Sequence, residues 1–419
     1  MRNNKDRDCY EYKKTELANG LRIISEYVPN LESFALGLSI NTGSRSDPKE
    51  LSGLAHFFEH ICFRDTEHRT SKQIAYQLEN IGANANAFTT KEMICFYARA
   101  LKKHFNSTLQ ILSDIVLFPK FDLKDIEKEK KIIIEEIKSI EDDPEELIFE
   151  QADKILFKNS KLAQTIAGTV ESVKNISQAD IINFHKQQIS PENIIVSFAG
   201  NICHDRAVEA ISKHFSHLEN NGYLPLKEKF TSIKSKNQFK KPYHQNHIVI
   251  CRRLPGIKHK DKMSLTILAS LLGEGFSSRL YQKLREQKSL AYSVFAQSHF
   301  FSDAGAFYIY IATDKANAAI SKVLIFDELE NLTTKKIHSS ELKRAKELTK
   351  TNITIELESL TARMQKLASN EFHFARKEDL SSKIEEINSI QLEDIKESAI
   401  KYFDIKNWKT IEFLSDPQY

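Results

Sequence analysis

The sequence has few cysteines, almost no net charge and no long apolar run. Its cysteines are widely spaced and include no CxxC pair; they are Cys9, Cys62, Cys95, Cys203 and Cys251. An odd number in such a pattern argues against a disulfide framework and favours a reducing compartment. The 60 basic and 57 acidic residues leave a formal net charge of +3, which indicates neither a nucleic acid nor an anionic membrane as a partner.

The apolar runs fall short of the roughly 18 residues that a membrane-spanning helix needs, so the sequence predicts no such helix. The segment before Leu21 carries Asp6, Asp8 and Glu11 and lacks the apolar core of a secretory signal. We therefore expect a cytoplasmic protein. With 419 residues, of which 41% are hydrophobic and 28% charged, the chain is long enough for two globular domains of roughly 200 residues each.

One short segment carries most of the chemical information: His56-Phe57-Phe58-Glu59-His60. In a helix of about 3.6 residues per turn, His56 and His60 lie on one side and can reach the same metal ion, with Glu59 between them. The order HxxEH is the inverted form of the HExxH arrangement of zinc peptidases. Apolar neighbours predict a mostly buried helix, in which histidines and a carboxylate need a partner such as a cation.

A catalytic zinc ion takes a third protein ligand and leaves its fourth position to water. Residues 125–142 are predicted to form a long helix, in which Glu129 and Glu136 share the face marked by the isoleucines. Glu135 is rotated by roughly 100° from that face and is the weaker candidate. The helix therefore offers two carboxylates that point into an otherwise apolar core.

Three further segments of the sequence carry motifs that can be compared with those of known families. Residues 82–92, Gly-Ala-Asn-Ala-Asn-Ala-Phe-Thr-Thr-Lys-Glu, contain an Asn-Ala-x-Thr sequence. The second half has Gly-Glu-Gly-Phe-Ser-Ser-Arg-Leu at 273–280 and Leu-Arg-Glu-Gln-Lys-Ser-Leu-Ala-Tyr at 284–292. With these segments, and with 75 residues between His60 and Glu136, the chain resembles the pitrilysin and mitochondrial processing peptidase family of inverted zinc metallopeptidases nearly from end to end, in its bacterial two-domain form.

The resemblance implies one zinc ion per chain, held by His56, His60 and Glu136. Such an ion lowers the pKa of its bound water and polarises a peptide carbonyl, and Glu59 is then the general base that takes the water proton. Glu129 occupies the place of a second family glutamate, seven residues before the ligand. It is expected to orient a histidine or to tune the metal.

The resemblance also implies how a peptide binds. An edge strand with small and polar side chains keeps its main chain open, so an extended peptide can add to it as a further β-strand. The substrate-binding residues of this strand are Ala83, Asn84, Ala85, Asn86, Ala87 and Phe88. Glu92, after the strand, is either a carboxylate that tunes the metal site or an ordinary turn residue.

Two residues of the second half are expected to act on the same substrate. In the family an Arg and a Tyr spaced by seven reach the substrate from the opposite domain, and Arg285 and Tyr292 match them. Tyr292 would donate to the developing oxyanion, while Arg285 would fix the substrate or the tyrosine. Without the resemblance, the two residues indicate only an ordinary amphipathic helix followed by a strand.

The predicted elements indicate an α+β fold with two similar halves. In the first half, strands such as 34–40 alternate with helices. The second half repeats this plan from His247 but has no HxxEH, as expected for an internal duplication in which one half kept the metal site. We expect two α/β-sandwich domains, residues 1–217 and 241–419, which are joined by a linker at 218–240 and form a clamshell cleft.

The leading interpretation is a zinc endopeptidase that cleaves unstructured peptides or presequence-like segments. One alternative is a non-catalytic or substrate-binding subunit of the same fold, although such subunits normally lose metal ligands. Another is a peptide-binding or zinc-storage protein without turnover. The expected partners are peptide substrates and a second chain, either an identical copy or a homologue.

Overall fold

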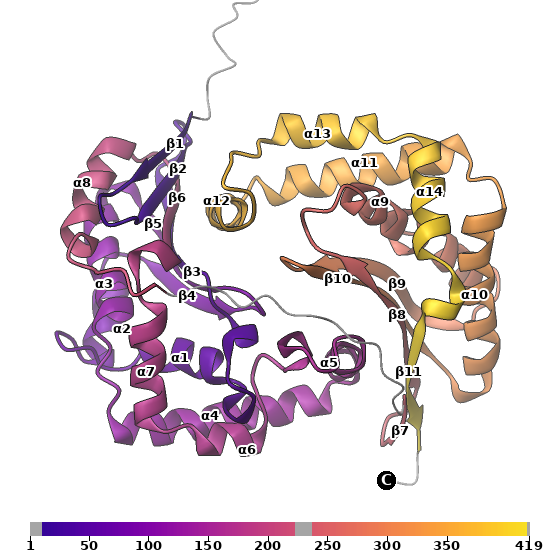
Figure 1. Ribbon diagram of the computed structural model, residues 1–419, viewed down its shortest axis with the longest axis horizontal. Helices are drawn as coiled ribbons and strands as arrows, with labels where there is room; N and C mark the ends of the chain where they lie inside the picture. Colours follow the sequence, from indigo (N-terminus) through magenta and orange to yellow (C-terminus); the bar gives the residue numbers. More distant parts are fainter. Residues whose placement is uncertain (1–10, 223–236, 417–419) are drawn as a thin grey trace, which may run out of the picture. The chain divides into compact units, whose positions relative to one another are not determined.

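Residues 11–222 and 237–416 are described by the computed structural model of the chain (Figure 1). They divide into two units. Unit 1 comprises the described residues of Met1–Lys138, Gln164–Leu226 and Glu356–Lys377. Unit 2 comprises those of Ser139–Ala163, Lys227–Ile355 and Glu378–Tyr419. Each unit is built on one β-sheet.

Unit 1 has a 6-stranded sheet in the order β1-β2-β6-β3-β5-β4. Its strands are β1 (Glu11–Glu16), β2 (Arg22–Tyr27), β3 (Ser33–Ile40), β4 (Asn84–Thr89), β5 (Ile94–Leu101) and β6 (Ile194–Gly200). Strands β2 and β6 run parallel, and the other neighbours run antiparallel. Strand β4 pairs with β5 alone, so its outer edge carries no strand from the described part of the chain.

The two faces of this sheet differ in side-chain size. On one face of β3, Phe34 packs edge-on against Phe105 of helix α3, with ring centroids 5.1 Å apart. On the other face Ala35 lies in a small cluster with Met364 of helix α12, and a Cβ added at Gly37 would lie 2.2 Å from the Met364 sulfur. Small residues on this face therefore let α12 lie close to the strand.

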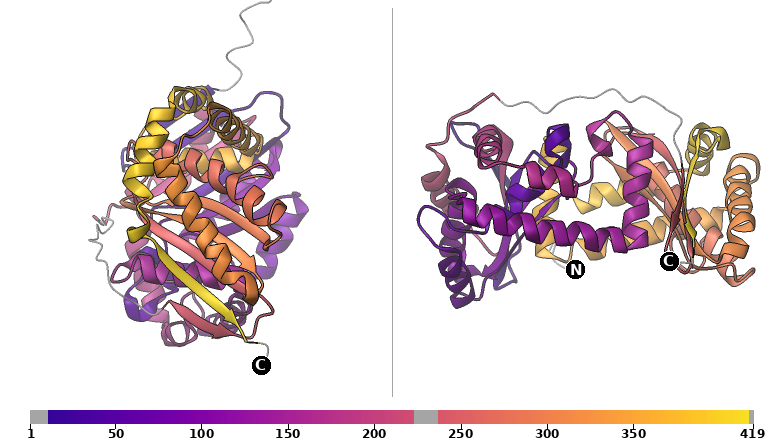
Figure 2. Two further views of the ribbon diagram at one scale, coloured as in Figure 1. Left: turned by 90° about the vertical axis from the view of Figure 1, so that its right-hand side faces the viewer. Right: turned by 90° about the horizontal axis from the view of Figure 1, so that it is seen from below.

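The helices of unit 1 surround this sheet, and α4 continues into the first residues of unit 2. They are α1 (Leu54–Cys62), α2 (Ser71–Asn80), α3 (Phe105–Leu117), α4 (Leu123–Asp142), α6 (Val170–Asn175), α7 (Gln178–Gln188), α8 (His204–Phe215) and α12 (Leu360–Phe374). Figure 2 shows α4 as one long unbroken helix.

Unit 2 has a 5-stranded sheet in the order β7-β11-β8-β10-β9. Its strands are β7 (Gln238–Lys241), β8 (Asn246–Pro255), β9 (Ala291–Phe300), β10 (Ala304–Thr313) and β11 (Lys409–Ser415). Alternation along the strands separates two apolar clusters. Ile250 and its partner Ile309 join one cluster, while the next pair, Cys251 and Tyr308, joins the other.

Helices cover both faces of the second sheet as well. The first cluster also receives residues of α9 (Lys262–Gly273), α10 (Ala318–Thr334) and α14 (Leu392–Tyr402). The second cluster receives α5 (Pro144–Leu156). Unit 2 is completed by α11 (Ser339–Glu356), by α13 (Leu380–Ser389) and by a π-helical turn, Tyr281–Glu286.

Two helices belong to the unit built by the other half of the sequence. Helix α5 follows the N-terminal helices but packs on β8 and β11, and α12 comes from the C-terminal half but packs on β2, β3 and β6 (Figure 1). Ion pairs anchor α12: Glu371 bonds to Lys14 at 2.7 Å, and Arg363 bonds to Glu26 at 2.5 Å. On α5, Asp153 accepts a hydrogen bond from the hydroxyl of Tyr308.

The expected α+β class with two similar units is confirmed. In each sheet the long central strand, β3 or β8, lies between a late strand, β6 or β11, and a hairpin whose second strand is the inner one. The two units are not continuous in sequence as the predicted domains 1–217 and 241–419 are, because α5 belongs to unit 2 and α12 to unit 1.

Residues 223–236 of the predicted linker lie outside the described residues. None of the described helices is both long and apolar enough to cross a membrane.

Candidate metal centre

The HxxEH segment lies on α1, whose start is fixed by an aspartate and two glycines. Asp47 is buried, and its carboxylate accepts hydrogen bonds from the backbone N–H groups of Gly53 at 2.8 Å and Ala55 at 2.9 Å. Gly53 has φ +94°, and a Cβ at Gly168 would lie 2.2 Å from the carbonyl oxygen of Ser52. Only glycine allows two backbones to pass this closely at the helix start. The orientation of α1 is therefore strongly determined.

The structure brings the three predicted ligands together, two from α1 and one from α4. The Nε2 atoms of His56 and His60 each lie 3.6 Å from a carboxylate oxygen of Glu136. The candidate ligand atoms of all three side chains lie within 4.8 Å of one another. Ligands of one tetrahedral zinc ion at about 2.0–2.2 Å are separated by roughly 3.3–3.6 Å. Two imidazoles and one carboxylate at these distances fit a zinc ion.

The choice among Glu129, Glu135 and Glu136 of α4 can be read from their contacts. Glu135 is exposed and pairs with Lys138 at 2.7 Å. Glu129 is 2% exposed and directs one oxygen at the Nδ1 of His60, 3.3 Å away, rather than at the Nε2 atoms of the two histidines. Glu136 alone faces both Nε2 atoms. The geometry therefore favours Glu136 as the ligand and Glu129 as a residue that orients His60.

Arg64 completes this arrangement, although no motif of the sequence singled it out. Its guanidinium donates to the same Glu129 carboxylate that faces His60. Although burial acts to raise the pKa of Glu129, its hydrogen bond with His60 and the charge of Arg64 lower the pKa below the ordinary value. Glu129 is thus held as an anion behind the His60 ring.

The two histidines differ electrostatically. Burial and the neighbouring His60 lower the pKa of His56 to about 4, so His56 is neutral and its Nε2 is able to bind a metal. For His60, burial lowers the pKa, but the hydrogen bond with Glu129 and the nearby carboxylates outweigh it, and the net pKa is raised. The Nδ1 of His56 is buried and has no hydrogen-bond partner among the described residues. Only His60 is therefore oriented by a carboxylate.

The predicted base, Glu59, lies on the same helix and touches the edge strand. Its Oε2 accepts a hydrogen bond from the hydroxyl of Thr89, the last residue of β4, at 2.5 Å. Burial raises the pKa of Glu59 despite this hydrogen bond. A carboxylate with a raised pKa, beside a metal site, is suited to accept and return a proton. By contrast, Glu92 pairs with Arg45 at 2.7 Å, an ion pair of the turn after β4.

The predicted peptide-binding strand is an edge strand. Ala83 precedes β4, and the other five residues of the predicted set lie within it. Asn84 and Asn86 are exposed, and the side chain of Asn86 accepts a hydrogen bond from the N–H of Ala87 at 2.8 Å. Phe88 joins the cluster beneath α12. Apart from the Ala87 N–H that bonds to Asn86, the outer main-chain edge of β4 pairs with no strand of the described residues, as a mode based on strand addition requires.

In unit 2, Arg285 and Tyr292 contact each other. The guanidinium of Arg285 donates to the carbonyl oxygen of Tyr292 at 2.5 Å and lies 4.9 Å from the centre of its ring. It also lies 5.0 Å from the ring centre of Tyr281. Tyr292 is 76% exposed. The two residues form a cation–π pair whose tyrosine is open to a ligand.

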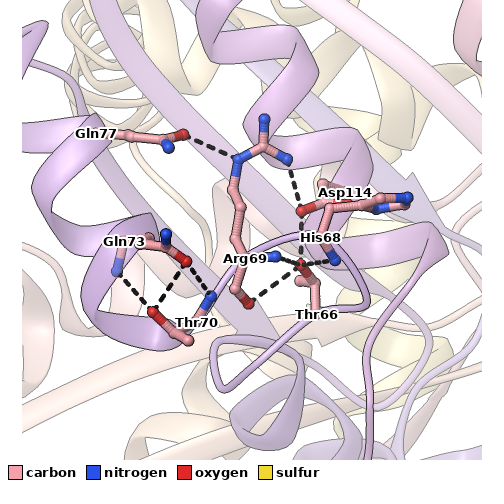
Figure 3. A network of polar contacts seen from close by, with 7 residues as sticks. All are labelled: Thr66, His68, Arg69, Thr70, Gln73, Gln77 and Asp114. Carbon is pink, nitrogen blue, oxygen red and sulfur yellow. Dashed lines mark hydrogen bonds and ion pairs between the residues drawn. The ribbon is translucent and has the colours of Figure 1, made fainter.

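A polar network holds the segment that follows α1 (Figure 3). Asp114 of α3 is buried and accepts hydrogen bonds from Thr66 and Arg69, both at 2.7 Å, and it lies 2.6 Å from the Nδ1 of His68. These contacts lower the pKa of Asp114, although burial acts in the opposite direction. Arg69 also bonds to Gln77 of α2 at 2.9 Å. The segment that leaves α1 is therefore tied to α2 and α3.

Comparison with known proteins defines the family. Residues 22–170 match the family model described as Insulinase (Peptidase family M16), and residues 175–349 match the one described as Peptidase M16 inactive domain. The chain is 32% identical over 391 residues to the uncharacterized zinc protease YmxG of Bacillus subtilis, a match that covers 93% of this chain and 95% of that protein. It is 31% identical over 398 residues to an uncharacterized zinc protease of Rickettsia felis, with 93% and 94% covered.

Solved structures show the same fold. A protease from Helicobacter pylori superposes with a TM-score of 0.88 at 22% identity, covering 96% of this chain and 99% of that one. A protein of Pseudomonas fluorescens described as a peptidase M16 inactive domain gives a TM-score of 0.90 at 18% identity, covering 97% and 98%. The chain belongs to peptidase family M16, and the resemblance found in its motifs is confirmed.

Proposed function

We propose that the chain is a zinc endopeptidase that hydrolyses unstructured peptides or presequence-like segments. The observation that carries the proposal is the convergence of His56, His60 and Glu136 within 4.8 Å, with Glu59 on the same helix as the two histidines. The relatives named zinc proteases support it. A non-catalytic subunit of the same fold has no need for a complete ligand set together with a base, so the site favours an active enzyme.

The residues divide the chemistry among them. Bound zinc would supply a Lewis acid for the scissile carbonyl and for the attacking water. Glu59 accepts a proton from that water at a carboxylate oxygen and returns it to the leaving amine. Glu129 and Arg64 hold the His60 ring so that its Nε2 remains directed at the metal position.

Substrate binding follows from the edge strand. A peptide in extended conformation pairs with the free main-chain edge of β4, and this mode reads backbone shape more than sequence. A folded protein holds most of its strands within its own sheets, so this binding mode favours unstructured segments as substrates. Tyr292 and Arg285 belong to the proposal as substrate-contacting residues of unit 2, with Tyr292 as the oxyanion donor. A cytoplasmic location and pairing with a second copy or a homologous chain belong to it as well.

The test combines metal analysis with peptide cleavage. The parent protein is expected to bind about one zinc per chain and to cleave a quenched unstructured peptide, and a chelator should abolish cleavage. Glu59→Gln should keep its zinc and lose cleavage, because the amide keeps the shape but cannot act as a base. A metal-loaded parent that cleaves no peptide would refute the peptidase proposal and leave a zinc-storage or substrate-binding protein.

The assignment of the third ligand has a matched control on the same helix. Glu136→Gln should lose most of its zinc, whereas Glu135→Gln, one residue away and exposed, should bind zinc as the parent does. The reverse result would mean that α4 presents a different carboxylate to the metal.

A further inference from the structure

Thr89 connects the edge strand to the general base. Side chains alternate along a strand, so Ala85, Ala87 and Thr89 share one face of β4. This face is turned toward α1, because the Thr89 hydroxyl donates to Glu59 of that helix at 2.5 Å. Phe88, on the opposite face, packs in the cluster beneath α12. The alanines leave the face toward α1 uncrowded, and the threonine is the residue that reaches the base.

The position of Thr89 is fixed by the same segment that fixes α1. A Cβ at Gly43 would lie 2.3 Å from the carbonyl oxygen of Thr90, and this oxygen accepts a hydrogen bond from the N–H of Ser44 at 3.1 Å. Asp47, three residues later, caps the start of α1. Segment 43–47 therefore braces both partners of the contact, the helix with Glu59 and the turn that follows Thr89.

A single hydrogen bond of this kind determines how a carboxylate is presented. The carboxylate of Glu59 can rotate about its last side-chain bond, whose rotation is only weakly restricted. The bond from Thr89 to Oε2 fixes that rotation and leaves Oε1 as the oxygen available to a water molecule. An error of about 1 Å in such a group can cost roughly a hundredfold in rate.

We propose that Thr89 is a positioning residue that links peptide pairing along β4 to the orientation of Glu59. The inference rests on the proposed peptidase function. A peptide that pairs with β4 is aligned along this strand, and Thr89, the last residue of the strand, holds the carboxylate of Glu59. Loss of the Thr89 hydroxyl should therefore impair the chemical step and leave peptide binding intact, because the main chain of β4 is unchanged.

Two variants that differ in the hydroxyl group test the role. Thr89→Val keeps the shape and removes the donor, and Thr89→Ser keeps the donor. For Thr89→Val we expect about one zinc per chain, KM within about twofold of the parent and kcat lowered roughly 10- to 100-fold, the scale of a lost hydrogen bond to a charged group. Thr89→Ser should stay within about threefold of the parent kcat. If Thr89 had only a structural role, the kcat of Thr89→Val would fall only in proportion to the loss of folded or zinc-loaded protein.

A second measurement detects the contact without turnover. Metal-free parent, Thr89→Val, Glu59→Ala and the double variant form a thermal double-mutant cycle. We expect Thr89→Val to lower Tm by about 2–4 °C when Glu59 is present and by clearly less in the Glu59→Ala background. Equal shifts in both backgrounds would show that the hydroxyl does not act through Glu59.

The outcomes separate the two proposals. A parent that cleaves peptide while Thr89→Val retains full kcat overturns the role of Thr89 and leaves the peptidase proposal standing. Equal impairment of Thr89→Ser and Thr89→Val, or loss of zinc in Thr89→Val, also overturns it. A parent that cleaves nothing overturns the peptidase proposal, and the role of Thr89 in catalysis falls with it.

Discussion

Glu129 places a carboxylate oxygen 3.3 Å from the Nδ1 of His60, while the Nε2 of the same ring faces Glu136 at 3.6 Å. The imidazole is therefore held from behind by one glutamate of α4 and turned toward the other. The two glutamates lie seven residues apart, which is close to two helical turns, so one straight helix supplies both contacts. His56 has no equivalent partner among the described residues, and its ring is held by burial and by the neighbouring His60 ring, 4.6 Å away.

This relationship predicts that Glu129→Gln weakens zinc binding without removing it. The substitution removes the negative charge behind His60 and leaves Arg64 without its anionic partner. We expect the zinc affinity to fall roughly 10- to 100-fold, as for other residues that orient a metal-bound histidine. Titration against a fluorescent chelator measures the change. An affinity within twofold of the parent, with Arg64 intact, would show that Glu129 does not orient the ligand.

The opposite pKa shifts of the two histidines predict how zinc affinity depends on pH. Zinc binds neutral imidazole, so protons compete for each ring below its pKa. The pKa of His60 is raised above 6.5, whereas that of His56 is lowered to about 4. Of the two histidines, only His60 releases a proton on binding between about pH 6 and pH 4.5, and this proton should lower the affinity about tenfold per pH unit.

Zinc titration at several pH values in this range checks that slope. A fall of about a hundredfold per unit would mean that both histidines are protonated in the metal-free protein. In Glu129→Gln, loss of the hydrogen bond that raises the pKa of His60 should move the onset of the fall to lower pH.

Much of the candidate site was predictable because it depends on local spacing. The i, i+4 relation places His56 and His60 on one side of a helix, and the seven-residue relation places Glu129 and Glu136 on one face. The predicted strand at 34–40 corresponds to β3, and the helix predicted at 125–142 corresponds to α4. These elements carry strong apolar periodicity, which is the most reliable local signal.

Contacts that join distant segments could not be predicted in this way. Arg64 is a basic residue in a polar loop, and only the folded chain shows that it pairs with Glu129. The Asn-Ala-x-Thr sequence drew attention to the strand, but not to the bond between Thr89 and Glu59. The packing of α5 and α12 on the sheet of the other half could likewise not be predicted from the sequence. Apolar periodicity shows which face of a helix is buried, but not against which sheet it is buried.

The crossing of two backbones at the start of α1 gives a prediction on stability. Gly168 has φ +82°, and a Cβ there would meet the carbonyl oxygen of Ser52 at 2.2 Å. Gly168→Ala should therefore lower the free energy of unfolding by more than about 2 kcal/mol, since backbone strain and a clash add. Gly82→Ala is the matched control, because Gly82 also has positive φ, +63°, but has open space around it. Its cost should be about 1 kcal/mol, from strain alone.

Thermal or urea unfolding compares the two glycine variants. Because Gly168 lies against the start of α1, which carries the proposed ligands His56 and His60, Gly168→Ala should also weaken zinc binding, and Gly82→Ala should not. Equal destabilisation by both substitutions would mean that the backbone near Ser52 can move away, and that the crossing does not determine the position of α1.

The last prediction concerns Tyr292, the proposed oxyanion donor of unit 2. Arg285 bonds to the carbonyl oxygen of Tyr292 and lies over its ring, so Tyr292→Phe preserves both contacts and removes only the exposed hydroxyl. We expect kcat on an unstructured peptide to fall roughly 10- to 1000-fold with a modest change in KM, the scale for loss of one oxyanion donor. Tyr281→Phe is the control, because Arg285 lies over that ring at a similar distance, 5.0 Å. It should retain kcat within about threefold. If both variants keep parental kcat, the Tyr292 hydroxyl does not contact the reacting group, and the role of Arg285 is limited to holding the tyrosine.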